Sequence, residues 1–375
     1  MISNKKPLKI FIVAGEESGD IHGSKLVKAM KNHTANIQFI GHGGDRMANE
    51  NVQIIEHIDD LAIIGIVEVI KRLPYMLKVM GSTVNWLREN NPDRLILIDY
   101  PGFNLRLARE ALQLGIPVTY FILPQVWAWK EGRVSILKNN VDQCLSIIPF
   151  EQEWFENRDV KTNFIGHPFV ELEPPKQTIN QFLSNHNLNQ DSPILTLLPG
   201  SRQQEINQLF PVYVKAVKML KSNIPNIQVI VGKAPGVTLP NTPDYIKIEE
   251  NDPRLTMYYG DAALVASGTA TLEAAVLDIP MVVSYRFSLL TWIFAKRMAM
   301  VQYASMVNLI ANEIIVPEFI QSDVTSENLM NAVIPLLNKT SERKKMLLGY
   351  EKVRRTLGMP GVYDRAAKAI IARLK

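Results

Sequence analysis

The chain alternates short, nearly continuous apolar runs with longer stretches in which apolar residues recur at helical spacing. This alternation predicts βα units, and strands without a polar side are typical of parallel sheets covered on both faces. Helices are predicted between most of the strands, for example at 21–31 and 105–114. In the first half the predicted strands are residues 9–14, 37–41, 94–98, 118–122, 143–147 and 162–166.

The pattern breaks at residues 171–193, a polar stretch with three prolines. We interpret it as an interdomain linker with room for a short helix. The sequence therefore predicts an α/β protein of two doubly wound, Rossmann-like domains, residues 1–170 and 171–344, with a cleft between them. The second βα series has predicted strands at 194–198, 228–231, 262–266 and 281–285 and helices at about 203–221 and 269–276.

Composition narrows the class of protein. The 375 residues suffice for about two domains. The net charge of +4, from 41 basic and 37 acidic residues, is too small to indicate nucleic acid, and it suits an anionic membrane or phosphorylated substrates. Cys144 is the only cysteine, which excludes an internal disulfide. No stretch has the roughly 18 apolar residues of a membrane span, so we expect a cytoplasmic protein, soluble or bound to a membrane surface.

Ligands of doubly wound domains bind where strands end and helices begin. Residues 15–20 follow the first predicted strand, and Glu16, Ser18 and Asp20 are the candidates there. Glycine lets the backbone approach a ligand, and a helix N-terminus attracts anions. A tight turn in which Ser18 or Asp20 caps the helix is an equally acceptable interpretation.

Asp99 ends another predicted strand and precedes Tyr100-Pro101-Gly102-Phe103-Asn104. A carboxylate in this place is suited to take a proton from an attacking hydroxyl. The alternative is that Asp99 only forms the turn before Pro101. Asn104 belongs to the same loop and is a candidate for contact with an acceptor substrate.

Two loops of the second half resemble each other, because each leads from a buried strand through small residues into a helix. Backbone amides, hydroxyls and a guanidinium suit a diphosphate, and a carboxylate one turn into a helix suits ribose hydroxyls. Ordinary helix starts are the alternative, but two such loops in one domain favour a nucleotide. The candidates are Ser201 and Arg202 in the first loop and Ser267, Gly268, Thr269 and Glu273 in the second.

Other catalytic signatures are missing. The six histidines are scattered without metal-ligand spacing, so no metal is predicted, and His167 is interpreted as a hinge residue. GxSxG and P-loop spacings are also absent, which argues against a serine hydrolase or a P-loop NTPase.

Residues 61–80 are unusually apolar and would form two apolar stripes on a helix. One stripe suffices to dock a helix on a sheet, so the second suits a lipid surface, with Lys71, Arg72 and Lys78 at headgroup level. A helix buried on both sides is the alternative. The apolar stretch 287–303 is a candidate homodimer interface. The candidate membrane contacts are Ile63, Ile66, Val69, Leu73 and Met76.

Seven segments in register resemble the lipid-A-disaccharide synthase family. The resemblance runs from about residue 10 to residue 318. Single motifs of this kind are weak, whereas seven in order are highly specific. The segments are AGEESGD, IDYPGFNLRLA, LPQVWAW, GHP, LPGSRQQEI, SGTATLEAA and the stretch 285–321.

The resemblance implies a GT-B glycosyltransferase that works at the cytoplasmic face of the inner membrane without a metal or other cofactor. Such an enzyme joins UDP-2,3-diacylglucosamine to 2,3-diacylglucosamine 1-phosphate with inversion and releases UDP. By resemblance, Asp99 is the base for the acceptor 6-hydroxyl, Arg202 lies near the UDP phosphates, and Glu273 and Asn308 belong to the nucleotide site. A last helix, within about 345–375, is expected to return to the first domain after a turn at 358–361.

The chain departs from the family pattern at Ser284, Val307 and Asn312, where a glycine, a proline and an arginine are expected. Two other functions are compatible with the loops. One is a UDP-N-acetylglucosamine 2-epimerase, which would share the phosphate loops without needing a lipid-facing surface. The other is a nucleotide-sugar-binding membrane module without catalysis, against which the presence of Asp99 and Arg202 argues.

Overall fold

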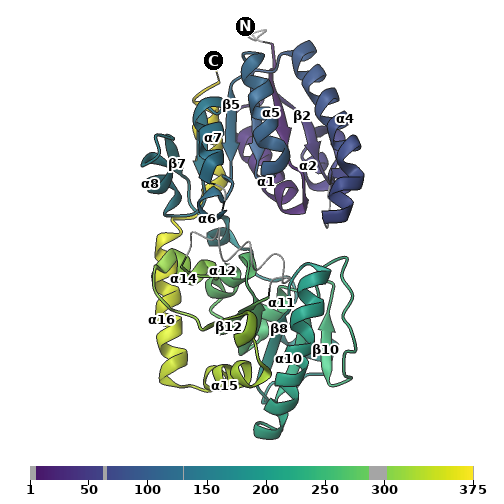
Figure 1. Ribbon diagram of the computed structural model, residues 1–375, viewed down its shortest axis with the longest axis vertical. Coiled ribbons are helices and arrows are strands. Elements are labelled where there is room, and N and C mark those ends of the chain that lie inside the picture. The colour runs from purple at the N-terminus through teal and green to yellow at the C-terminus, as the bar shows by residue number, and fades with distance from the viewer. Residues whose placement is uncertain (1–5, 62–65, 130, 287–301, 375) are drawn as a thin grey trace. The chain divides into compact units, whose positions relative to one another are not determined.

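The computed structural model describes residues 6–61, 66–129, 131–286 and 302–374, without the side chains of 66–72 and 129 (Figure 1). The chain divides into two compact units. The first consists of Met1–Glu171 and Leu357–Lys375, and the second of Leu172–Thr356. Within the described ranges, no helix is both long enough and apolar enough to cross a bilayer.

The first unit contains a parallel sheet of seven described strands in the order β3-β2-β1-β4-β5-β6-β7. Its strands are β1 (Leu8–Val13), β2 (Ile37–Gly43), β3 (Val52–His57), β4 (Arg94–Ile98), β5 (Val118–Phe121), β6 (Gln143–Ser146) and β7 (Thr162–Phe164). Its helices are α1 (Glu17–His33), α2 (Asp45–Asn49), α3 (Ile58–Leu61), α4 (Ile66–Asn90), α5 (Pro101–Gln113), α6 (Val126–Trp129), α7 (Val134–Asn140), α8 (Glu151–Glu156) and α17 (Val362–Ile371), with 3-10 turns at Glu131–Arg133 and Pro168–Glu171.

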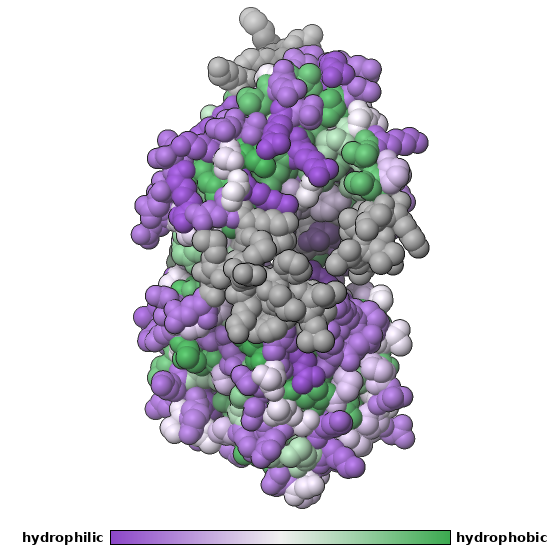
Figure 2. Space-filling model, in the orientation of Figure 1, coloured by the Kyte–Doolittle hydropathy of each residue, from purple (hydrophilic) through white to green (hydrophobic). Residues whose placement is uncertain are grey.

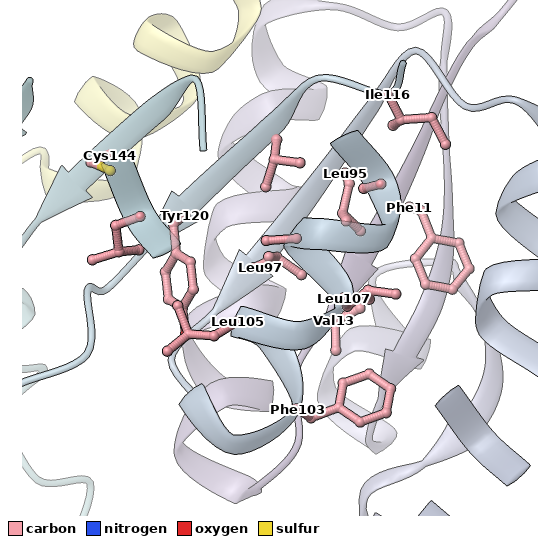
Figure 3. Close-up of a cluster of buried hydrophobic side chains, with 14 of the residues drawn as sticks. Phe11, Val13, Leu95, Leu97, Phe103, Leu105, Leu107, Ile116, Tyr120 and Cys144 are labelled. Atoms are coloured by element: carbon pink, nitrogen blue, oxygen red, sulfur yellow. The ribbon is translucent and has the colours of Figure 1, made fainter. Parts of the chain in front are cut away.

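The central strands β1, β4 and β5 are buried on both faces over most of their length, which explains their largely apolar runs. Leu95 and Leu97 of β4 join the core cluster that also contains Phe103 of α5 (Figure 3). Ile98 points to the opposite face, where its Cδ1 lies close to Gly23 of α1. Successive side chains of a strand alternate between faces, so each strand supplies both helical layers with apolar groups.

The chain returns to the first unit at its C-terminal end, where α17 packs on α1 (Figure 1, yellow). The carboxylate of Glu171 accepts hydrogen bonds from the amides of Gly361 and Val362 at the start of α17. The amide of His167 donates to the carbonyl of Leu357 at 2.8 Å, so the outgoing and returning segments are bonded to each other. Helix α16 (Ser341–Thr356) belongs to the second unit, and the first unit resumes at Leu357.

The second unit contains a parallel sheet of six described strands in the order β10-β9-β8-β11-β12-β13. Its strands are β8 (Ile194–Leu198), β9 (Gln228–Gly232), β10 (Ile246–Glu249), β11 (Ala262–Ala266), β12 (Met281–Tyr285) and β13 (Glu318–Ile320). Its further helices are α9 (Ile179–His186), α10 (Gln203–Asn223), α11 (Leu255–Tyr259), α12 (Thr269–Val276), α14 (Met306–Ala311) and α15 (Ser326–Leu337), with a 3-10 turn at Gln321–Asp323.

Much of the stretch interpreted as a linker is folded into the second unit. Helix α9 begins with a capping box in which Thr178 and Gln181 satisfy each other's backbone amides. Phe182 of α9 is buried in a cluster with Ile194 of β8 and Leu255 of α11. The stretch therefore contains a short helix, for which the sequence interpretation left room, and this helix packs into the second unit.

The strand orders identify where each unit is suited to bind a ligand. In the first sheet the order reverses between β1 and β4, and in the second between β8 and β11. The loops that follow these strands diverge to opposite faces and leave room at the carboxyl edge of the sheet. Residues 14–16 and 99–100 flank the first reversal, and residues 199–202 and 267–268 flank the second.

Candidate active site

Asp99 stands directly after β4 at the reversal of the first sheet. Asp99 and Tyr100 both have left-handed backbone conformations, with φ of 42° and 48°. Burial and, to a smaller extent, the negative charge of Glu16 together raise the pKa of the Asp99 carboxyl to about 7. A carboxyl with this pKa is partly ionised near neutral pH and also accepts a proton readily, as a general base must.

Glu16 comes from the loop after β1 and lies close enough to Asp99 to affect its charge. The two loops meet at Gly15, where a Cβ atom would lie 2.2 Å from Cδ1 of the Tyr100 ring, so only glycine fits. Ser18 lies inside α1 and donates to Glu16 Oε1 at 2.7 Å, so it does not cap the helix. Glu16 and Ser18 are both exposed and therefore accessible to a substrate.

Asp20 has a different role from the one predicted. Its side chain is 2% exposed, and its carboxylate accepts hydrogen bonds from the amides of Gly44, Arg46 and Met47 at 2.7–3.1 Å. These amides open helix α2, so Asp20 caps a neighbouring helix and not its own. The carboxylate is thereby withdrawn from any acceptor substrate.

Asn104 is fully buried beneath the Asp99 loop. Its Nδ2 donates to the carbonyl oxygens of Ile98 at 3.1 Å and Asp99 at 2.8 Å. The side chain predicted to contact the acceptor therefore holds the backbone on which the candidate base stands.

Glu151 is an acidic residue of this region that the sequence did not single out, because it looks like an ordinary first residue of a helix. It is wholly buried at the start of α8, where Trp127 Nε1 donates to it at 3.0 Å. Burial raises the pKa of the Glu151 carboxyl to about 8, and the charge of Asp99 contributes. Glu151 is therefore largely protonated at neutral pH and adds little buried charge beside Asp99.

In the second unit, backbone amides of the loop after β8 bind a carboxylate that belongs to the protein itself. Glu205 Oε2 accepts hydrogen bonds from the amides of Ser201 at 3.1 Å and Arg202 at 3.4 Å, and Glu205 Oε1 lies 3.2 Å from Arg202 Nη1. The Gly200 conformation, φ 122°, and its contact with the Glu205 side chain both require glycine. The amides expected to bind a phosphate are thus occupied, while the Arg202 side chain is 72% exposed.

The loop after β11 leads into α12 as predicted. Ser267 Oγ donates to the carbonyl of Ala304 at 2.7 Å, whereas Gly268 and Thr269 are exposed at the helix start. Burial raises the pKa of Glu273, one turn further, to about 7, and the positive charge of Arg254 opposes that shift. Within the described part of the chain, the Glu273 carboxylate forms no hydrogen bond or ion pair.

Asn308 is fully buried, and both polar atoms of its side chain form hydrogen bonds within the protein. Its Oδ1 accepts from the amides of Ile315 and Val316, and its Nδ2 donates to the Val316 carbonyl and to Glu318 Oε1, all at 2.8–2.9 Å. Glu318 also accepts from the amide of Ser305 at 2.8 Å. The structure therefore makes Asn308 a support for this loop, which the resemblance assigns to the nucleotide site.

The three departures from the family pattern have structural roles. The Ser284 hydroxyl is 2.5 Å from the hydroxyl of Tyr213, and both residues are fully buried. Val307 is buried in α14, and Asn312 takes the left-handed conformation that ends this helix.

Helix α4 carries part of the proposed membrane surface. Leu73 and Leu77 are 46% and 57% exposed, and Figure 2 shows apolar surface over this edge of the first unit. Met76 is only partly exposed and packs against the core cluster, so it does not belong to the apolar stripe proposed to face lipid. Ile63 and the stretch 287–301 lie outside the described residues, as do the side chains of Ile66 and Val69.

Two parallel, doubly wound sheets with loops of this kind define a protein of the GT-B class. The fold is similar to that of a UDP-GlcNAc 2-epimerase from Neisseria meningitidis, with a TM-score of 0.65, 11% identity and coverage of 98% of this chain and 99% of that chain. It is also similar to the glycotransferase of kitacinnamycin, with a TM-score of 0.63, 14% identity and coverage of 99% and 100%. Likenesses at this identity show the fold alone.

The sequence comparisons identify the family. Residues 10–370 match the family described as lipid-A-disaccharide synthetase. A lipid-A-disaccharide synthase of Myxococcus xanthus is 38% identical over 378 residues, covering 98% of each chain. The chain therefore belongs to the lipid-A-disaccharide synthetase family, and the epimerase alternative is not favoured.

The proximity of Glu16 to Asp99 predicts how activity depends on pH. Removing the Glu16 charge should lower the pKa of Asp99, because one of the two causes that raise it is gone. In a Glu16→Gln variant the acidic limb of the kcat profile should therefore move from about pH 7 to lower pH. Glu17→Gln, an exposed neighbour on α1, is the control and should leave the limb in place. Equal profiles for all three proteins would contradict an electrostatic role for Glu16.

Proposed function

We propose that this protein joins UDP-2,3-diacylglucosamine to 2,3-diacylglucosamine 1-phosphate, giving the β-1,6-linked lipid A disaccharide 1-phosphate and UDP. Family membership supports the glycosyltransferase class and the use of a UDP-sugar. The observation that carries the mechanism is Asp99, a carboxyl with a pKa of about 7 at the reversal of the first sheet. The first unit is accordingly proposed as the acceptor domain and the second as the UDP-sugar domain.

In the proposed reaction, Asp99 takes the proton of the acceptor 6-hydroxyl as the oxygen attacks the anomeric carbon of the donor. The bond between that carbon and the UDP oxygen breaks, and UDP leaves with the electron pair, which inverts the anomeric centre. Glu16 and Ser18, exposed beside Asp99, are proposed to bind acceptor hydroxyls. Proton removal by a positioned base typically contributes about 10²- to 10⁴-fold to the rate.

The nucleotide is proposed to bind at the reversal of the second sheet. Arg202 has an exposed guanidinium suited to the diphosphate, and Gly268 and Thr269 present the N-terminus of α12 to it. Glu273 is half-buried and without a hydrogen-bond partner among the described residues, which suits a carboxylate that accepts from ribose hydroxyls. Glu205 then holds the Ser201–Arg202 backbone in place from within the protein.

The base assignment is tested with Asp99→Asn, which keeps the shape of the side chain and removes its basicity. We expect kcat to fall about 10²- to 10⁴-fold while UDP affinity stays nearly unchanged. Disaccharide formation from the two acylated substrates would be measured by mass spectrometry, and UDP binding by calorimetry. Near-normal turnover in the variant would remove Asp99 from the mechanism. Absence of disaccharide from the unmodified protein, with UDP binding intact, would favour a binding module.

The nucleotide site is tested by comparing UDP with inorganic pyrophosphate. Arg202→Ala should weaken both ligands, at a cost of about 1.5–3 kcal/mol, because its proposed partner is phosphate. Glu273→Gln should weaken UDP and leave pyrophosphate nearly unaffected, because its proposed partner is ribose. Lys218→Ala, an exposed change on α10, is the control. A Glu273 variant that loses both ligands equally would contradict the ribose assignment.

Association with the inner-membrane surface is proposed from Leu73, Leu77 and the exposed Lys78 of α4. Both substrates carry acyl chains, and each CH₂ group transferred to water costs about 0.8 kcal/mol, so an enzyme on the bilayer avoids that cost. The proposed localisation is therefore cytoplasmic, with peripheral binding to the membrane.

We expect the double variant Leu73→Ser/Leu77→Ser to sediment less with anionic vesicles than the unmodified protein, with its melting temperature retained. Leu112→Ser is the matched control, since Leu112 of α5 is 51% exposed but outside α4. High salt should weaken binding, because an anionic surface attracts each nearby lysine by about 1 kcal/mol. Unchanged sedimentation of a folded double variant would place the membrane contact elsewhere.

A further inference from the structure

The turn that carries Asp99 is held in a conformation that its residues disfavour. Asp99 and Tyr100 are consecutive non-glycine residues with positive φ. Such backbone costs free energy and persists where surrounding contacts enforce it. The contacts that enforce it here therefore determine where the Asp99 carboxyl points.

Two buried side chains donate to the same atom of this turn, the carbonyl oxygen of Asp99. The Tyr120 hydroxyl lies 2.6 Å from it and Asn104 Nδ2 lies 2.8 Å from it. Both side chains are wholly buried, so no solvent competes for these bonds. The donors come from β5 and α5, two separate elements, and fix the peptide plane after Asp99 from two directions.

Tyr120 is placed for this contact by the sheet itself. It pairs with Leu97 in the register of β4 and β5, two positions before Asp99. Its ring belongs to the core of the first unit, and Figure 3 shows the side chain extending from β5 toward Leu105 of α5. The ring is therefore fixed by packing, and its hydroxyl reaches the carboxyl end of the neighbouring strand.

We propose that Tyr120 is a positioning residue for catalysis: by bonding the Asp99 carbonyl, with Asn104, it holds the strained turn that aims the Asp99 carboxyl at the acceptor hydroxyl. The proposal rests on the proposed function, in which Asp99 is the base. Tyr120 itself contacts the backbone and not the reacting atoms.

The test is Tyr120→Phe, which removes one hydroxyl and keeps the ring. We expect kcat to fall about tenfold, as for one hydrogen bond of ordinary strength, with KM and UDP affinity unchanged. The acidic limb of the kcat profile should also move below pH 7, because the carboxyl is no longer held in its desolvated position. Asn104→Ala, which removes the other donor, should move both quantities in the same directions.

Tyr213→Phe is the matched control, since Tyr213 is also wholly buried and its hydroxyl bonds to Ser284 in the second unit. The Tyr213→Phe variant should lower the melting temperature by an amount similar to that for Tyr120→Phe, and it should leave the acidic limb of the kcat profile in place. A limb that shifts equally in both variants, or in neither, would overturn the proposal. If Tyr120→Phe fails to fold, Asn104→Ala decides, and unchanged kcat and limb in that variant would overturn it. If Asp99→Asn retains turnover, the proposed base itself fails, which is a separate result.

Discussion

The pairing of β1 with β4 is the constraint on which the first unit's chemistry depends. Phe11 pairs with Leu95 and Val13 with Leu97, so the two strands run in parallel and end at the same edge of the sheet. Their loops then diverge to opposite faces, which leaves Glu16 and Asp99 beside each other. The pairing of β8 with β11 acts in the same way in the second unit and brings the Arg202 loop to the start of α12.

The central strands could be predicted because burial on both faces leaves a continuous apolar signal. The predicted and observed bounds of β4, β8, β11 and β12 agree, as do those of α12. The edge strands β3, β10 and β13 were not predicted. In β10, Ile246–Glu249, a buried and an exposed isoleucine alternate with charged residues, so the pattern is too short and too polar to recognise. Edge strands have one neighbour and need less apolar surface.

The sequence predicted which types of residue form the candidate site, but it did not predict the hydrogen-bond partners of these residues. Asp99 directly follows a strand, Arg202 directly precedes a helix, and Glu273 lies one turn into α12, as the spacing indicated. Spacing does not show that Asp20 caps α2 or that Glu205 occupies the amides beside Arg202, because both depend on which amides tertiary packing brings near. The sequence did not indicate Glu151 for the same reason, since its raised pKa results mainly from burial and also from the charge of Asp99, both of which depend on tertiary packing.

Burial of these carboxyl groups also gives activity and stability opposite pH dependences in the first unit. The ordinary pKa of an aspartate near 3.8 is raised to about 7 in Asp99, and that of a glutamate near 4.5 is raised to about 8 in Glu151. A group whose pKa is raised on folding stabilises the folded state in its protonated form. That contribution is complete below the ordinary pKa values, and it is lost as pH rises through about 7 and 8. The proposed base, however, works only when ionised, so the rate should rise over the pH range in which this stability falls. The contacts that hold the Asp99 turn from β5 and α5 lie in the core of the first unit, where they oppose relaxation of the ionised carboxylate toward solvent.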